Sequence, residues 1–259
     1  MEFENLQVSV DGAIGSLMLN RPERLNALTF NALSDLAAAA RWFDNQVDVK
    51  VVKVTGAGGS FCSGFDLDVF ASPDTSVPRR ELADRGRIMA DAITDMRAIT
   101  IVAMQERCVG GGMVLAAACD LRIAAHDCLF SIPEADLGIP LSWGGIPRLV
   151  REIGPALTKE LVLTCREFEA EEAADIGFLN RVVPADRLFV ELDELADKVA
   201  SKSKLVITTT KSHVNAVSDE IAATTHARRD ADVMVSALAD QESREVGAAY
   251  LERFHNKGF

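Results

Sequence analysis

The chain has 259 residues, of which 48% are hydrophobic and 25% charged, and 27 Lys and Arg against 39 Asp and Glu give a net charge of −12. This composition is ordinary for a soluble globular protein with one large domain, or with a domain and an appendage. The negative charge argues against nucleic acid and against an anionic membrane as partners, because both bind basic surfaces. No run approaches the ~18 apolar residues of a membrane span, and no leader pattern opens the sequence. We therefore expect a cytoplasmic protein.

Cysteine and histidine usage indicates neither disulfides nor a metal site. The cysteines are odd in number and lack short paired spacings, which favours reduced core thiols. They are Cys62, Cys108, Cys119, Cys128 and Cys165. The histidines lack metal-ligand spacing, which argues against a metal site. None lies where it could activate Ser63 as a nucleophile, which argues against a Ser-His-Asp catalytic triad. The histidines are His126, His213, His226 and His255.

The first fifth of the chain predicts a hairpin, a helix and a strand. Alternating apolar residues at 6–10 and 14–19, on either side of Asp11-Gly12, are typical of a β-hairpin. Thr29 is a suitable N-cap for a helix over residues 30–43, which carries a stripe of apolar side chains. Residues 49–54 then read as a short apolar strand.

The middle of the chain alternates between strand and helix patterns after an exposed segment expected at residues 72–78. A helix is predicted from Glu81, with one apolar face formed by Ile88, Met89, Ala92, Ile93 and Met96. The later elements are strands at 101–104, 121–125 and 129–132, and helices at 113–119 and 146–153. Such alternation predicts an α/β core with crossover connections.

Beyond Pro184 the pattern is almost purely helical. We therefore predict a boundary near residue 195, with an α/β core over residues 1–195 and a helical subdomain over residues 196–259. The apolar positions of this second part need a surface to cover, either within the chain or on a neighbouring subunit.

A glycine triplet and a lone acid carry the functional signal. Gly110, Gly111 and Gly112 precede an apolar helix, and bare N–H groups at a helix N-terminus form a site for an anion. Glu134 follows within an apolar segment, where a carboxylate can take and return a proton. Together they indicate an enzyme that stabilises an oxyanion while it moves a proton beside it.

Five stretches in the same order resemble the crotonase superfamily, the enoyl-CoA hydratase/isomerase family. They are NRPERLNAL (20–28), FCSGFDL (61–67), GGGMVLAAACDLRIA (110–124), PEADLGIP (133–140) and EAEEAADIGFLNRVV (169–183). The resemblance implies an α/β fold built as a spiral of ββα turns, with a C-terminal helical region that assembles trimers, often paired into hexamers as dimers of trimers. It also implies an acyl-CoA thioester substrate, in fatty acid metabolism, with no cofactor beyond the coenzyme A of that substrate.

The same resemblance assigns site residues by position. Glu134 would be catalytic, and the N–H groups of Phe65 and Gly111 would hold the thioester oxygen; a side chain at Gly111 would block the thioester. Arg24 would be a candidate neighbour of a coenzyme A phosphate, and Trp143 and Met113 would line the pocket of the acyl group. These residues belong to a larger set expected to contact the acyl-CoA. The set comprises Arg24, Leu25, Ala27, Ser63, Phe65, Asp66, Leu67, Asp68, Gly111, Met113 and Trp143.

The chain departs from the family's hydratases at Val114, which stands where their first catalytic glutamate would be. Glu134 fills the second position. The aspartates of dienoyl-CoA isomerases and of dihydroxynaphthoyl-CoA synthases would fall at Ser142 and Leu141. One carboxylate suffices for a 1,3-proton shift, so we favour a Δ3,Δ2-enoyl-CoA isomerase. The alternatives are a hydratase in which Glu134 acts alone, with a water held by backbone or Asp136, and a non-catalytic acyl-CoA-binding protein.

Overall fold

The structure is a computed structural model that describes residues 3–72 and 76–256, with side chains up to residue 253. In this part of the chain a six-stranded sheet has the order β1-β2-β3-β4-β6-β9. Only β1 and β2 pair antiparallel; the other neighbours are parallel. The strands are β1 (Leu6–Asp11), β2 (Ile14–Leu19), β3 (Val51–Gly56), β4 (Ile99–Met104), β6 (Leu121–Ala125) and β9 (Arg181–Val183). Short strands form a second sheet, β5-β7-β8, from β5 (Arg107–Val109), β7 (Leu129–Ser131) and β8 (Phe168–Glu169).

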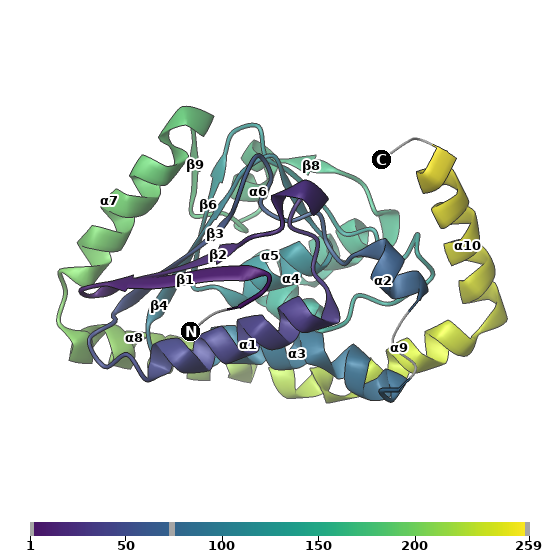
Figure 1. Cartoon of the computed structure of the whole chain (residues 1–259), viewed down its shortest axis with the longest axis horizontal. Helices are drawn as coiled ribbons and strands as arrows, with labels where there is room; N and C mark the ends of the chain where they lie inside the picture. Colours follow the sequence, from purple (N-terminus) through teal and green to yellow (C-terminus); the bar gives the residue numbers. More distant parts are fainter. Residues whose placement is uncertain (1–2, 73–75, 257–259) are drawn as a thin grey trace.

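Helices cover both faces of the larger sheet, as the apolar strands of a parallel sheet require. On one face, Val51, Ile101 and Ile123 pack against Leu188 and Leu192 of α7 (Leu188–Ala200). The opposite face carries the main core against the helices below it in Figure 1. Of the helices that precede α7, α1 (Phe30–Asp44) and α3 (Arg79–Asp95) lie below the sheet in Figure 1. The others are α2 (Leu67–Ala71), α4 (Gly111–Ala118), α5 (Gly145–Thr164) and α6 (Ala170–Asp175).

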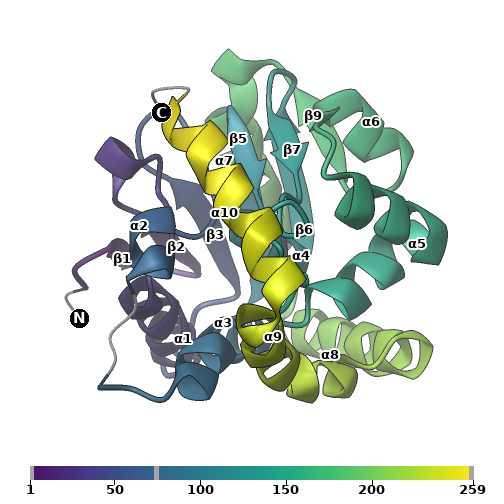
Figure 2. The same cartoon turned by 90° about the vertical axis from the view of Figure 1, so that its right-hand side faces the viewer.

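The C-terminal fifth is helical and wraps from the base of the molecule to one end. It comprises α8 (Lys204–Ile221), η3 (Thr224–Arg229), α9 (Asp230–Ala239) and α10 (Gln241–Asn256); the short helices η1 (Pro22–Arg24) and η2 (Ala185–Arg187) lie earlier. α10 stands at the end of the molecule opposite α7 (Figures 1 and 2). Lys211 anchors α8 to the sheet, because its Nζ donates to the Ala98 carbonyl (2.9 Å) and to Asp120 Oδ2 (2.7 Å).

Most of the predicted elements are confirmed. The hairpin is β1–β2, and Thr29 caps α1 by accepting a hydrogen bond from the Ala32 N–H at 3.1 Å. The α/β core followed by C-terminal helices is also as expected. The proposed division after residue 195, which falls inside α7, stays a prediction. Residues 73–75 of the expected exposed segment, and residues 257–259, lie outside the described residues.

Two local expectations were wrong. Ile88 was expected on the apolar face of its helix, but it is 42% exposed on α3. The helix predicted over residues 146–153 is the first half of the longer α5. Its backbone leaves helical geometry at Gly154 (φ 77°, ψ 167°), and the helix resumes at Pro155, whose fixed φ suits a first helical position. The break marked the end of the pattern, so the second half was missed.

No helix among the described residues has both the length and the apolar character needed to cross a membrane.

Candidate active site

The glycine triplet joins β5 to α4 in a conformation that only glycine adopts readily. Gly110 has φ 49° and ψ −109°, and its N–H donates to the Ser131 carbonyl at 2.9 Å, which ties the end of β7 to the start of α4. α4 begins at Gly111, and every one of its residues is buried. The N-terminus of this helix therefore meets the segment that leads from β7 into Glu134.

Glu134 lies in a tight turn, with its carboxyl group over Gly110. Its carbonyl accepts from the N–H groups of Leu137 (3.1 Å) and Ile139 (3.0 Å), which fixes the turn. A Cβ added to Gly110 would lie 2.6 Å from Glu134 Oε1, so the two residues are in direct contact. Although part of the residue is accessible, Oε2 is buried and has no hydrogen-bond partner in the described part of the chain.

This burial changes the acidity of Glu134. Loss of hydration disfavours the carboxylate and raises the pKa from its ordinary value of 4.5 to about 7, although a backbone hydrogen bond opposes the change. A carboxyl group with that pKa is divided between both forms near neutral pH. It is therefore suited to accept a proton and to return it.

Two backbone N–H groups, those of Phe65 and Gly111, have no hydrogen-bond partner among the described residues. Leu28 makes a parallel bridge to Phe65 through the flanking Gly64 carbonyl (2.7 Å) and Asp66 N–H (2.9 Å), so the Phe65 N–H remains unused. Gly111 is the first residue of α4, where backbone N–H groups have no intrahelical acceptor.

Pairing of the segments that carry these two amides brings them together. Cys62 exchanges hydrogen bonds with β5, donating to Arg107 and accepting from Val109, each at 3.0 Å. A Cβ on Gly64 would lie 3.2 Å from the Val109 carbonyl oxygen. The two loops therefore run side by side as they approach Phe65 and Gly111.

Aromatic side chains line the same region. The Phe65 ring lies 4.9 Å from Phe30 and 5.8 Å from Trp143, measured between ring centroids. Met113 and Val114 on α4 are buried in the main core cluster. The surroundings of Gly111, which contacts Trp143 and Leu28, are therefore apolar on this side.

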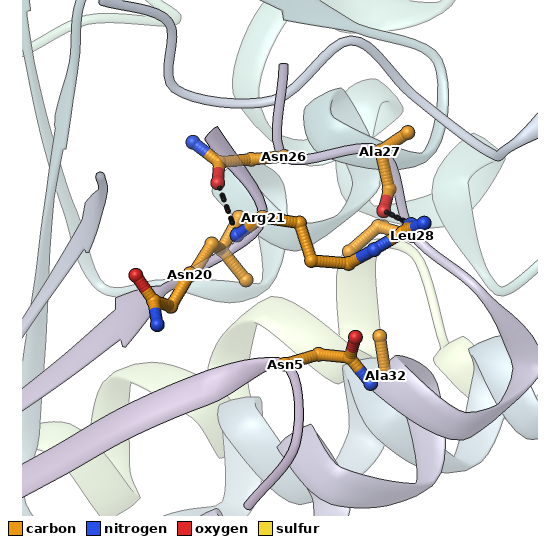
Figure 3. A pocket seen from close by; sticks show the side chains of 8 residues that line it. Asn5, Asn20, Arg21, Asn26, Ala27, Leu28 and Ala32 are labelled. Carbon is orange, nitrogen blue, oxygen red and sulfur yellow. Dashed lines mark hydrogen bonds between the residues drawn. The ribbon is translucent and has the colours of Figure 1, made fainter. Parts of the chain in front are cut away.

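A rigid loop at residues 21–28 borders the site. The Arg21 guanidinium donates to the Ala27 carbonyl (2.6 Å), and Asn26 Oδ1 accepts from the Arg21 N–H (2.9 Å), as Figure 3 shows. Leu25 and Asn26 both have positive φ (48° and 55°), and Leu25 is 43% exposed. The cavity behind this loop has about 10 Å³, which is room for about one water molecule.

Acidic partners occupy the arginines that flank this loop. Buried Asp66 caps α2 and pairs with both Arg21 and Arg24 at 3.2 Å, and Arg24 also contacts Asp68 at 2.5 Å. Burial favours a higher pKa for Asp66, but hydrogen bonds from Arg21 and the charge of Arg24 outweigh it, so the pKa is lowered. The guanidinium expected near a phosphate is thus already paired with two carboxylates.

The remaining expected contact residues follow the same loop. The Ser63 N–H donates to the Leu25 carbonyl (3.0 Å) and its hydroxyl to the Arg24 carbonyl (3.4 Å), while Leu67 begins α2. The structure therefore brings the expected coenzyme A residues into one strip beside Phe65.

Helix α10 packs over the outer side of the Glu134 turn. A Cβ on Gly247 would lie 2.6 Å from the Leu137 carbonyl oxygen, and one on Gly138 would overlap the backbone of Ser243. Burial raises the pKa of Tyr250, and the negative charges of Asp136 and Glu134 add to the effect. The C-terminal helix thus brings a phenol towards the acid of the site, while Asp136 is exposed.

Some residues that shape the site gave little sequence signal. Gly86 on α3 contacts Trp143. Arg148 and Asp230 hold the Trp143 loop through the backbone of Gly144. A lone glycine inside a helical pattern was the only clue to Gly86.

The sequence matches the enoyl-CoA hydratase/isomerase family model over residues 9–257. The chain belongs to this family. It is 31% identical over 255 residues to the crotonyl-CoA hydratase of Syntrophomonas wolfei, covering 98% of this chain and 97% of the relative. It is 34% identical over 226 residues to the peroxisomal Delta(3,5)-Delta(2,4)-dienoyl-CoA isomerase of Arabidopsis thaliana, covering 81% and 80%.

Solved structures show the same fold. An enoyl-CoA hydratase from Mycobacterium avium subsp. paratuberculosis superposes with a TM-score of 0.87 at 24% identity, covering 97% of each chain. The expected crotonase fold, with two sheets and C-terminal helices, is therefore confirmed, as is the family resemblance. Membership of the enoyl-CoA hydratase/isomerase family makes the protein an enzyme that acts on acyl-CoA.

Proposed function

We propose that the chain is a Δ3,Δ2-enoyl-CoA isomerase that uses Glu134 as its single acid–base group. The Glu134 carboxylate removes a proton from C2 of a 3-enoyl-CoA, and the electron pair of that C–H bond moves towards the carbonyl carbon, which places the negative charge on the thioester oxygen of a dienolate. Glu134 then returns the proton at C4, which gives the 2-enoyl-CoA. The observation that carries this proposal is the buried carboxyl group beside Gly110, with a pKa raised by burial to about 7.

The two unused amides supply the second half of the mechanism. The Phe65 and Gly111 N–H groups donate to the thioester oxygen, where negative charge develops, and the N-terminus of α4 adds its dipole. Loss of one such donor costs on the order of 100- to 1000-fold in rate. The coenzyme A part of the substrate contacts the strip formed by Leu25, Ala27, Ser63 and residues 66–68. Arg24 binds a phosphate of coenzyme A in place of one of the two carboxylates with which it is paired.

Val114 favours isomerisation over hydration. It is 2% exposed, and a Cβ on Gly145 would lie 3.0 Å from both Val114 Cγ2 and Leu141 Cγ, so these residues form one apolar cluster. An isopropyl group neither holds a water molecule nor accepts its proton. A 1,3-proton shift needs only one carboxylate, which Glu134 provides.

Hydration is the second candidate, because the crotonyl-CoA hydratase of Syntrophomonas wolfei is one of several hydratases among the relatives of this chain. In that reaction Glu134 would act alone on a water molecule held by backbone or by Asp136. A third alternative is binding of acyl-CoA without turnover.

Two substrates separate the candidates. The purified protein should convert 3-hexenoyl-CoA to 2-hexenoyl-CoA and add little water to 2-hexenoyl-CoA, as followed by chromatography of the CoA esters. Formation of 3-hydroxyhexanoyl-CoA as the main product would establish hydration instead. Binding of both esters without turnover would support the third alternative.

A gain-of-function variant tests the role given to Val114. Val114→Glu places a second carboxyl group on α4 and should raise the hydration of 2-hexenoyl-CoA at least ~10-fold, because general acid–base assistance is worth more than this. Val114→Met, which adds length without charge, is the matched control and should not hydrate. Equal hydration by the two variants would show that position 114 is remote from the reacting carbons.

We also propose that the chain forms a homotrimer or a hexamer made of two trimers. α8 exposes several large apolar side chains that the described chain leaves uncovered: Leu205, Val206, Val214, Val217 and Ile221. Light scattering should give a mass three or six times the 28.0 kDa of the chain; a mass of one chain would contradict this. The cytoplasmic location stays a prediction.

A further inference from the structure

Trp143 fills a slot between α3 and α4 that two glycines create. A Cβ added to Gly111 would lie 2.6 Å from Trp143 Cζ3, and one added to Gly86 would overlap the indole atoms Cδ2 and Cε2. A third side of the indole faces the Phe65 ring, with a centroid separation of 5.8 Å. Alanine in place of either glycine would therefore displace the indole.

The backbone around Trp143 is held from three helices. Trp143 has φ 62°, an uncommon conformation for a bulky residue. Next to it, the Gly144 carbonyl accepts from Arg148 Nη1 (3.1 Å) and the Gly144 N–H donates to Asp230 Oδ2 (2.8 Å). Arg148 is 1% exposed and pairs with Asp91 at 3.0 Å. This network fixes the indole, because movement of the loop would leave buried charges without partners.

The indole lies on the apolar side of the proposed oxyanion site. Asp66, which follows Phe65, is paired with arginines, whereas the Phe65 ring packs against the rings of Phe30 and Trp143. The thioester carbonyl joins a charged coenzyme A part to an apolar acyl part. With the oxygen at the Gly111 N–H, the acyl carbons extend towards the side on which the indole covers Gly111.

We propose that Trp143 sets the length of the acyl chain that this enzyme accepts, by closing the slot between Gly86 and Gly111. This inference rests on the proposed function for the orientation of the substrate. Short acyl chains end at the indole, and longer chains would have to displace it from its clamped position. Removal of the indole leaves an apolar channel between α3 and α4, in which each newly buried methylene adds about fourfold in affinity.

The test measures binding rather than turnover. Calorimetry with butanoyl-, hexanoyl- and decanoyl-CoA should show weaker binding of decanoyl-CoA by the wild-type chain. In Trp143→Ala the ratio of decanoyl- to butanoyl-CoA affinity should rise at least ~10-fold. Trp42→Ala, which truncates the other tryptophan of the chain, on α1, is the matched control and should keep the wild-type ratio. If Trp143→Ala does not fold, Trp143→Leu should shift the ratio in the same direction.

A second pair of variants tests the slot itself. Gly86→Ala should lower the midpoint of thermal unfolding in the wild-type background, where its Cβ meets the indole, but not in the Trp143→Ala background, where that space is free. An unchanged chain-length ratio in folded Trp143→Ala, or equal effects of Gly86→Ala in both backgrounds, would overturn the proposal. Failure of the wild-type chain to bind any acyl-CoA would instead overturn the proposed function, and this inference with it.

Discussion

Replacing Glu134 with Gln should lower the turnover of 3-hexenoyl-CoA by at least ~1000-fold while the affinity for the acyl-CoA stays within about threefold. The amide keeps the shape of the side chain over Gly110 but has no basic oxygen, and the proposed proton transfer has no other acceptor. Single-turnover kinetics and calorimetric binding measure the two effects separately. Glu171→Gln, the same change at an exposed position on α6, is the matched control and should keep full turnover.

The raised pKa of Glu134 should also make the activity of the wild-type enzyme depend on pH. In the wild-type enzyme kcat/KM should rise with pH and level off above about pH 7, because the base must be ionised. A rate that does not change between pH 5 and pH 9 would remove Glu134 from the rate-determining proton transfer.

Stability changes in the opposite direction with pH. Between pH 4.5 and about 7 the folded chain binds more protons at Glu134 than the unfolded chain does, so stability present below pH 4.5 is lost as the pH rises through 7. This loss is on the order of 3 kcal/mol, because a tenfold change in the ionisation constant corresponds to about 1.4 kcal/mol. Glu134→Gln removes this loss of stability. The free energy of unfolding of the variant, measured by urea unfolding, should therefore increase relative to that of the wild type from pH 4 to pH 8.

Local chemistry made much of the fold predictable. Thr29 accepts the hydrogen bond expected of an N-cap, and the alternation on either side of Asp11-Gly12 became the β1–β2 hairpin. In each case the residues that decide the structure are close in sequence, or belong to one strand pair.

The order of the motifs along the chain predicted more of the candidate site than the local pattern of any one motif did. The glycine triplet and the Pro133-Glu134 pair are twenty residues apart, yet the fold places the Glu134 carboxyl group on Gly110. Together with three further stretches in the same order, they indicated the family, and the family implied the pairing.

What the sequence left out depends on contacts between distant segments. The slot for Trp143 needs Gly86 and Gly111, which are 57 and 32 residues away along the chain, and its clamp needs Asp91 and Asp230. An exposed face also cannot be distinguished from a buried one by periodicity alone, which is why Ile88 was misplaced. Such features are set by tertiary packing, and local propensity does not encode them.

Gly110→Ala should lower turnover on the order of 100-fold without abolishing folding. The methyl group would lie 2.6 Å from Glu134 Oε1, so the carboxyl group must move, and a displacement of about 1 Å from the productive geometry costs about that much in rate. The backbone at φ 49° and ψ −109° adds strain of about 1–3 kcal/mol, which is less than the stability of a typical domain.

Gly59→Ala is the matched control for this substitution, because an added Cβ at Gly59 meets no atom within 4 Å. It should leave both turnover and the unfolding midpoint close to those of the wild type. If Gly110→Ala folds cooperatively and turns over 3-hexenoyl-CoA at the wild-type rate, then contact between Gly110 and the Glu134 carboxyl group is irrelevant to the reaction. Combining Gly110→Ala with Glu134→Gln gives a sharper distinction: the double variant should be no slower than Glu134→Gln alone, because the methyl group acts only by moving a base that is already gone.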